Sequence, residues 1–127
     1  MHAVPAAQTF LRDFENLDWE RFRRTFADDA TVFFPVPEPP RRFSGRAEIE
    51  RQFRRVFAAI RANSRSAAAP FHRLPPVGLN CSPISKDAAL VSFTLENEQR
   101  IGRRTLIWRR IGNRWRITHL HASNVER

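Results

Sequence analysis

The sequence predicts an α+β fold in which N-terminal helices pack into the concave face of one curved antiparallel sheet. Three observations support this prediction. Apolar residues recur at helical spacing in the first half of the chain, whereas the alternation typical of strands dominates after residue 70. The last quarter consists of two long alternating runs that flank a turn at residues 111–114. No repeat or linker interrupts the 127 residues, so a single domain over residues 1–127 is expected.

Three segments carry the apolar stripes of amphipathic helices. In the first, Phe10, Leu11 and Phe14 share one face, and in the second Asp18 is placed as an N-cap immediately before the stripe begins. The third follows Gly45 and places arginines opposite its apolar stripe. The predicted helices are residues 6–16, 19–26 and 46–62.

Strands are predicted where β-branched and aromatic residues form short runs between turn signals. A first strand at residues 30–34 ends at Pro35, and the prolines that follow, up to Pro40, impose an extended loop. Proline also interrupts residues 71–84, which indicates a bent or edge strand. After a loop at 97–102 come the two closing strands, so the remaining predicted strands are residues 89–96, 103–110 and 115–123.

The composition favours a soluble globular protein without a role in nucleic-acid binding. The formal net charge is +9, but the basic residues are spread along the chain, and Lys86 is the only lysine among 22 of them. The single Cys81 excludes an internal disulfide framework. No charged segment followed by an apolar run stands at Met1, and no apolar run approaches the ~18 residues of a membrane span. A cytoplasmic location with no membrane partner is therefore expected.

Three stretches resemble the NTF2-like superfamily, which includes the SnoaL-like proteins and the ketosteroid isomerases. Residues 18–32 resemble its second helix and first strand, and residues 43–49 resemble its glycine-led third helix. Residues 115–123 resemble its closing strand, especially in the branch shared with the association domain of calcium/calmodulin-dependent protein kinase. The resemblance implies a cone-shaped α+β sheet with an open-ended pocket, in a protein that forms a homodimer.

The resemblance also implies where related proteins hold their polar groups. The proton-transfer base, the tyrosine and the donor acid of the isomerases fall on Phe34, Phe10 and Leu106. Hydrocarbon side chains neither take nor donate a proton, so ketosteroid isomerase activity is not expected. The three pocket arginines of the kinase association domain fall on Leu95, Leu106 and Ala122, so an apolar inner surface without an anion clamp is expected there.

These matches imply a pocket lined mainly by hydrocarbon. Eleven phenylalanines and no tyrosine supply large apolar side chains, and such a pocket suits an apolar or aromatic small molecule. Trp19 and Trp108 fit core packing as well as a pocket wall. The predicted lining residues are Phe10, Phe14, Trp19, Phe34, Phe53, Phe57, Leu95, Leu106, Trp108, Leu120 and Ala122.

Two histidines, His119 and His121, lie at strand spacing in the last predicted strand. Parity with the family's closing strand places them, together with Trp115 and Ile117, on the convex face of the sheet. A homodimer interface is expected on that face.

The sequence leaves three classes of function open. The leading hypothesis is a protein that binds an apolar small molecule, and a second is an assembly module that acts through its terminal strands. A third is a cofactor-free lyase or isomerase of the cyclase or dehydratase type, with His72, His119 or Asp29 as acid–base groups. Asp28 and Asp29 also fit a solvated turn between helix and strand. The sequence has no metal-ligand cluster or nucleotide fingerprint, so neither a metal nor a cofactor is expected.

Overall fold

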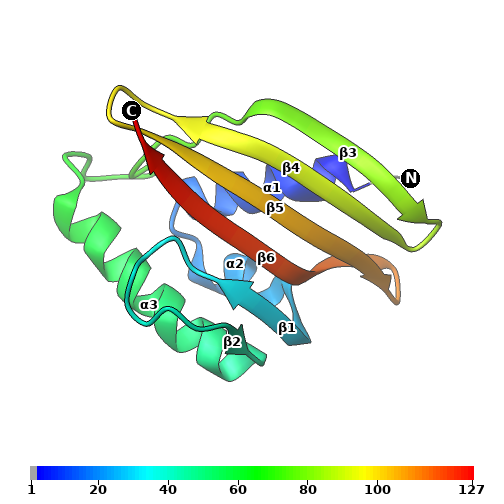
Figure 1. Ribbon diagram of the computed structural model, residues 1–127. Coiled ribbons are helices and arrows are strands. Elements are labelled where there is room, and N and C mark those ends of the chain that lie inside the picture. Colours follow the sequence, from blue (N-terminus) through cyan, green and yellow to red (C-terminus); the bar gives the residue numbers. More distant parts are fainter. Residues whose placement is uncertain (1–2) are drawn as a thin grey trace.

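The computed structural model describes residues 3–127, in which three helices pack against one face of a curved sheet of six strands (Figure 1). This arrangement confirms the predicted α+β class. The helices are α1 (Val4–Glu15), α2 (Trp19–Arg24) and α3 (Arg46–Asn63). The strands are β1 (Phe26–Phe33), β2 (Phe43–Ser44), β3 (Val77–Ser85), β4 (Ala88–Glu96), β5 (Arg100–Ile111) and β6 (Arg114–Glu126), in the spatial order β2-β1-β6-β5-β4-β3.

Strands β3 to β6 form the predicted antiparallel meander, but β1 runs parallel to β6. The sheet is therefore mixed, and the prediction of a wholly antiparallel sheet is wrong at this pair. One helix and four strands separate β1 from β6 along the chain, so no tight hairpin sets their relative direction. The prediction of an edge strand is confirmed, because β3 and its Pro83 lie at one edge of the sheet.

Tertiary pairing moves several boundaries from their predicted positions. Helix α2 ends at Arg24, and β1 begins at Phe26, because Phe26 pairs with Ile117 of β6. Asp28 and Asp29 therefore lie within β1 and not in a turn, and both are exposed where the register between β1 and β6 shifts. The two residues of β2 are too few to show a periodic pattern. Strand β3 begins later, and β5 earlier, than predicted.

Local signals at helix and turn ends act as the sequence predicts. The Asp18 carboxylate accepts a hydrogen bond from the backbone N–H of Arg21 at 3.3 Å and caps α2. Gly45 precedes α3 with a φ of 88°, and Gly112 closes the β5–β6 turn with a φ of 64°. Both values lie in the left-handed region, which glycine adopts without the steric cost of a Cβ.

Aromatic side chains from all three helices and β1 form the core beneath the sheet. Phe22 lies at the centre of this aromatic core and is 0% exposed. Its ring centroid lies 4.8–6.4 Å from those of six neighbours, which are Phe10, Phe14, Trp19, Phe26, Phe53 and Phe57. The phenylalanine-rich composition is thus used to join α1, α2 and α3 to the sheet.

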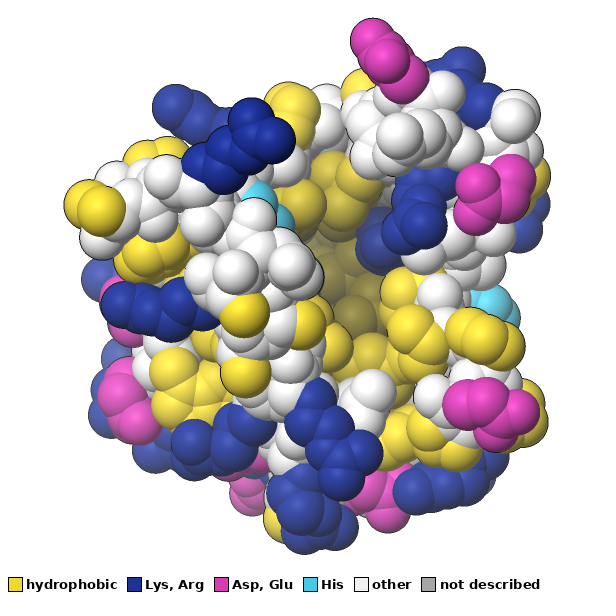
Figure 2. Space-filling model, turned by 90° about the vertical axis from the view of Figure 1, so that its left-hand side faces the viewer, with side chains coloured by type: hydrophobic (Ala, Val, Ile, Leu, Met, Phe, Trp, Pro, Cys, Tyr) yellow, Lys and Arg dark blue, Asp and Glu magenta, His cyan; other side chains and the backbone are white. Residues whose placement is uncertain are grey.

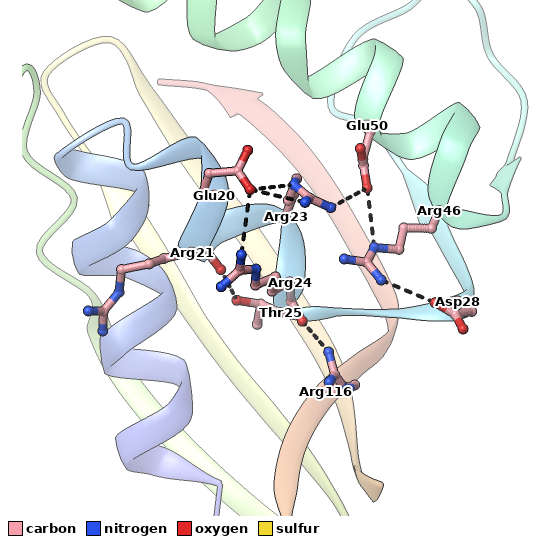
Figure 3. Close-up of polar contacts among 9 residues, drawn as sticks. All are labelled: Glu20, Arg21, Arg23, Arg24, Thr25, Asp28, Arg46, Glu50 and Arg116. Carbon is pink, nitrogen blue, oxygen red and sulfur yellow. Dashed lines mark hydrogen bonds and ion pairs between the residues drawn. The ribbon is translucent and has the colours of Figure 1, made fainter.

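Outside the aromatic core, a chain of ion pairs joins α2, α3 and β1 (Figure 3). Glu20 lies 3.0 Å from Arg23, and Glu50 contacts Arg23 at 3.8 Å and Arg46 at 3.2 Å. Arg46 also lies 3.1 Å from Asp28 of β1. The network gives these arginines carboxylate partners within the chain, so they do not indicate an anionic ligand.

A bulge in β6 changes which face the preceding residues occupy. Ile107 of β5 pairs with His119, whereas the next residue of β5 pairs with Ile117, so Thr118 is the extra residue. Ile117 is consequently 0% exposed, and Trp115 packs against the core. The prediction that Trp115 and Ile117 share the outer face with His119 is wrong, because simple parity fails across a bulge.

Candidate functional site

A cavity of about 700 Å³ lies between the concave face of the sheet and helices α1 and α3. It opens at the end of the molecule where the C-terminus and the β4–β5 turn lie. Figure 2 looks into this opening and shows hydrophobic side chains on the walls of the hollow, with basic side chains at its rim. The volume falls within the range of about 300–1,000 Å³ typical of small-molecule sites.

The inner face of the sheet changes from apolar to polar towards the mouth of the cavity. The antiparallel register aligns one inward residue from each of β4, β5 and β6 in rows across the sheet. From the closed end to the mouth, the rows are Ala89, Trp108 and Ile117; Val91, Leu106 and Leu120; Phe93, Arg104 and Ala122; and Leu95, Gly102 and Asn124. Beyond the last row, Arg100 and Glu126 line the mouth.

Eight of the eleven lining residues predicted from sequence lie on the cavity wall, and they are Phe10, Phe14, Phe34, Phe53, Leu95, Leu106, Leu120 and Ala122. The other three belong to the packing behind the wall. Trp108 is fully buried beneath Phe10, with 6.4 Å between the ring centroids. Trp19 packs against Phe57 at 5.2 Å, and the guanidinium of Arg54 lies over its ring.

Phe10, Phe34 and Leu106, the positions matched to the proton-transfer groups of the isomerases, all lie on the cavity wall. Phe10 comes from α1, Phe34 directly follows β1, and Leu106 lies on β5. The three side chains present only hydrocarbon to the cavity. Proton transfer of the isomerase type therefore has no donor or acceptor at these positions.

Sequence reasoning missed the polar residues of the cavity, and the one farthest from the mouth on β5 is Arg104, on the inner face of the strand. Its Nη1 donates to the backbone oxygens of Arg103 and Ser123, at 3.0 and 3.1 Å, and to Oδ1 of Asn124 at 3.3 Å. The inner surface is thus not wholly apolar, contrary to the expectation drawn from the resemblance. The sequence did contain a signal, because Arg104 shares its strand face with Leu106.

Within residues 3–127, no carboxylate forms an ion pair with Arg104. Burial lowers the pKa of Arg104 from its usual value, and the positive charge of Arg100 lowers it further. Arg100 lies at the mouth, 4.0 Å from Glu126. The Arg104 guanidinium stays charged, since arginine is not deprotonated in proteins. The cavity therefore combines an apolar inner end with a positive wall near its mouth.

Of the three acid–base candidates named from sequence, only His72 lines the cavity. Its Nε2 lies 2.8 Å from the carbonyl oxygen of Phe14, and the two rings form an edge contact at 5.2 Å. A carbonyl oxygen only accepts, so Nε2 donates, and Nδ1 of the neutral ring carries the lone pair. His72 therefore places an imidazole on the cavity wall, with Nδ1 outside this hydrogen bond.

His119 and Asp29 lie away from the cavity. His119 is on the uncovered face of the sheet, where its Nδ1 lies 2.6 Å from Oγ1 of Thr31. Burial and the neighbouring His121 lower the pKa of His119. Asp29 is exposed on β1 and lies 3.6 Å from Arg109. Neither side chain can reach a molecule bound in the cavity.

Among residues 3–127, no group of three or more histidine, cysteine, aspartate and glutamate side chains is arranged to hold a metal ion. None of the helices in this part of the chain is long and apolar enough to cross a membrane.

Helices packed in the concave face of a curved sheet, around a cavity open at one end, define a fold class, that of the NTF2-like proteins. Within that class, the family model of the SnoaL-like domain matches residues 5–126. The chain therefore belongs to the SnoaL-like domain family. No curated protein matches the sequence.

Solved structures of distant sequence share this fold. A DUF3225-family protein of unknown function from Pectobacterium atrosepticum has a TM-score of 0.75 at 17% identity, covering 98% of this chain and 88% of its own. A candidate dehydratase of the NTF2-like family from Streptomyces avermitilis has a TM-score of 0.74 at 22% identity, with coverage of 96% and 93%. The association domain of CaMKII from C. elegans has a TM-score of 0.69 at 20% identity, with coverage of 94% and 91%. At these identities the likeness establishes the fold alone, and function has to be argued from the site.

Proposed function

We propose that this protein binds an apolar or aromatic small molecule in the cavity between the sheet and helices α1 and α3. The observation that supports this proposal is the 700 Å³ cavity itself, whose inner end is formed by hydrocarbon side chains such as Phe10, Leu106 and Leu120. Burial of apolar ligand surface against such walls provides affinity. The few polar groups, at the mouth, would fix the orientation of the ligand.

Titration with N-phenyl-1-naphthylamine, a neutral probe that fluoresces in apolar sites, tests the proposal. The wild-type protein is expected to bind one probe per chain in a saturable manner. In Ala122→Phe, a ring added to the inner face of β6 occupies the cavity, so affinity is expected to fall at least about tenfold. Ser92→Phe, which adds the same ring to the outer face of β4, is the control. Absence of saturable binding, or equal binding by Ala122→Phe, would refute the proposal.

A homodimer that forms through the uncovered face of the sheet is a second proposal. Phe33 lies on this face with its ring centroid 5.1 Å from that of His121 and 5.9 Å from that of His119, so aromatic surface is concentrated there. Light scattering after size exclusion is expected to give twice the chain mass of 14.8 kDa. Phe33→Glu should yield a monomer, whereas Ile84→Glu on the exposed edge strand should not. A monomeric wild-type protein would exclude this dimer.

Catalysis as a cofactor-free lyase or isomerase is the alternative that His72 supports, since its imidazole lies on the cavity wall. A reaction of that kind would be lost in His72→Gln, which keeps a donor for the Phe14 carbonyl but has no titratable group. Turnover that is unchanged in His72→Gln would exclude His72 as the base.

A further inference from the structure

Arg104 is held on the cavity wall in close contact with Gly102. Its guanidinium lies across Gly102, where an added Cβ would be 3.1 Å from Nη1 and 3.3 Å from Nη2. Nη1 donates to three carbonyl oxygens of β5 and β6, including that of the Asn124 side chain. These contacts fix the guanidinium against the inner face of the sheet, so its position does not depend on a ligand.

The opposite edge of the same guanidinium has no partner in the described part of the chain. Nε and Nη2 of Arg104 carry two N–H groups that point in parallel, and neither has an acceptor among residues 3–127. Two parallel donors match the two oxygens of a carboxylate, which they bind as a bidentate pair. The guanidinium is partly desolvated and has no counter-ion among residues 3–127, so a negative group from outside the chain would be stabilised there.

The charges around Arg104 favour a partner with a single negative group. Arg100 adds positive charge on the side of the mouth and acts with burial to lower the pKa of Arg104, and the two arginines face only one nearby carboxylate within residues 3–127, that of Glu126. Glu126 also lies at the mouth and would repel a second negative group that extended outwards.

We propose that the cavity binds an amphipathic monocarboxylate, whose carboxylate pairs with the Nε–Nη2 edge of Arg104 and whose apolar or aromatic body points inwards. The next row of the sheet places Leu106 and Leu120 under that body, and Phe10 faces them from α1. This inference rests on the proposed ligand-binding function and adds to it the chemical class of the ligand.

Two probes with the same ring system and different charge, 2-naphthoate and 2-naphthamide, test the inference by isothermal titration calorimetry at pH 7. The wild-type protein is expected to bind naphthoate at least about tenfold more tightly than naphthamide, as a charge-assisted bidentate pair implies. Arg104→Gln should abolish this preference and leave naphthamide affinity within about twofold. Arg103→Gln, one residue along the strand and on its outer face, is the matched control and should retain the preference.

Arg104→Lys keeps the charge but not the pair of parallel donors, so most of the preference should be lost. Equal affinity of the wild-type protein for the two probes, or full preference in Arg104→Gln, would overturn the inference. The outcome is separable from that of the ligand-binding proposal. If N-phenyl-1-naphthylamine binds and is excluded by Ala122→Phe while the two naphthalene probes bind equally, only the carboxylate inference is overturned.

Discussion

Replacing Phe22 by alanine perturbs the aromatic core that backs the cavity. Phe22 is 0% exposed, and its ring lies within 6.4 Å of six other aromatic rings. Truncation removes the transfer free energy of a buried phenyl group, roughly 1.5–3 kcal/mol. It also leaves a void among bulky neighbours from three helices, which cannot all move to fill it. We therefore expect the free energy of unfolding to fall by about 4 kcal/mol, within the range for buried phenylalanines.

Urea unfolding followed by circular dichroism measures this loss. With a slope of about 1–3 kcal/mol per molar urea, a loss of about 4 kcal/mol lowers the midpoint by more than about 1 M. Phe71→Ala is the control, because Phe71 is only half-buried and packs under the guanidinium of Arg61 at 4.6 Å. Its loss should cost about 1 kcal/mol or less. The reasoning is refuted if Phe22→Ala is no more destabilising than Phe71→Ala.

Three further predictions concern the pH dependence of stability, the bulge in β6 and the contact between Arg104 and Gly102. Burial, His121 and Arg42 lower the pKa of His119 in the folded protein below its usual value of 6.5. The unfolded chain therefore binds more protons at this histidine than the folded chain does. The free energy of unfolding consequently decreases as the pH falls through 6.5 towards the folded pKa. Urea midpoints between pH 5 and 8 should therefore fall less steeply in His119→Asn, and an unchanged slope would contradict this. Deletion of Thr118 removes the bulge and leaves the side chains of β6 alternating regularly between the two faces, with Leu120 still inward, so it should be tolerated. Deletion of Leu120 should instead prevent folding. Thermal melts of the two variants would show the difference. Gly102→Ala places a Cβ against the Arg104 guanidinium and should weaken 2-naphthoate binding with little effect on 2-naphthamide; equal loss for both would argue against a specific effect on Arg104.

The local pattern of the sequence was sufficient for most elements of the fold. Helix α1 is visible in the spacing of Phe10 and Phe14, and α2 begins at its Asp18 cap, because both signals depend on neighbours within about one helical turn. The closing hairpin is visible in the alternation around Gly112, since side chains in a strand alternate with a period of two. The family resemblance added the cone-shaped fold, and eight of the eleven lining residues predicted with it lie on the cavity wall.

Only the tertiary structure decided the features that depend on pairing between distant segments. Phe26 belongs to β1 and not to α2 because Ile117, ninety-one residues later, pairs with it. Strand β6 also contains a bulge at Thr118, which turns Ile117 inwards. No local sequence pattern predicts this bulge.

The Arg104 site likewise depends on how the strands pair. An arginine in an alternating strand carries no sign in the sequence that it will lie across a glycine and donate to the neighbouring strand. Nor does it show that one edge of the guanidinium will have no partner among residues 3–127. Sequence alone therefore determined the class of fold, and it led us to expect an apolar cavity. The hydrogen bonds that hold Arg104 became visible only when β5 and β6 were placed side by side, because the acceptors come from both strands.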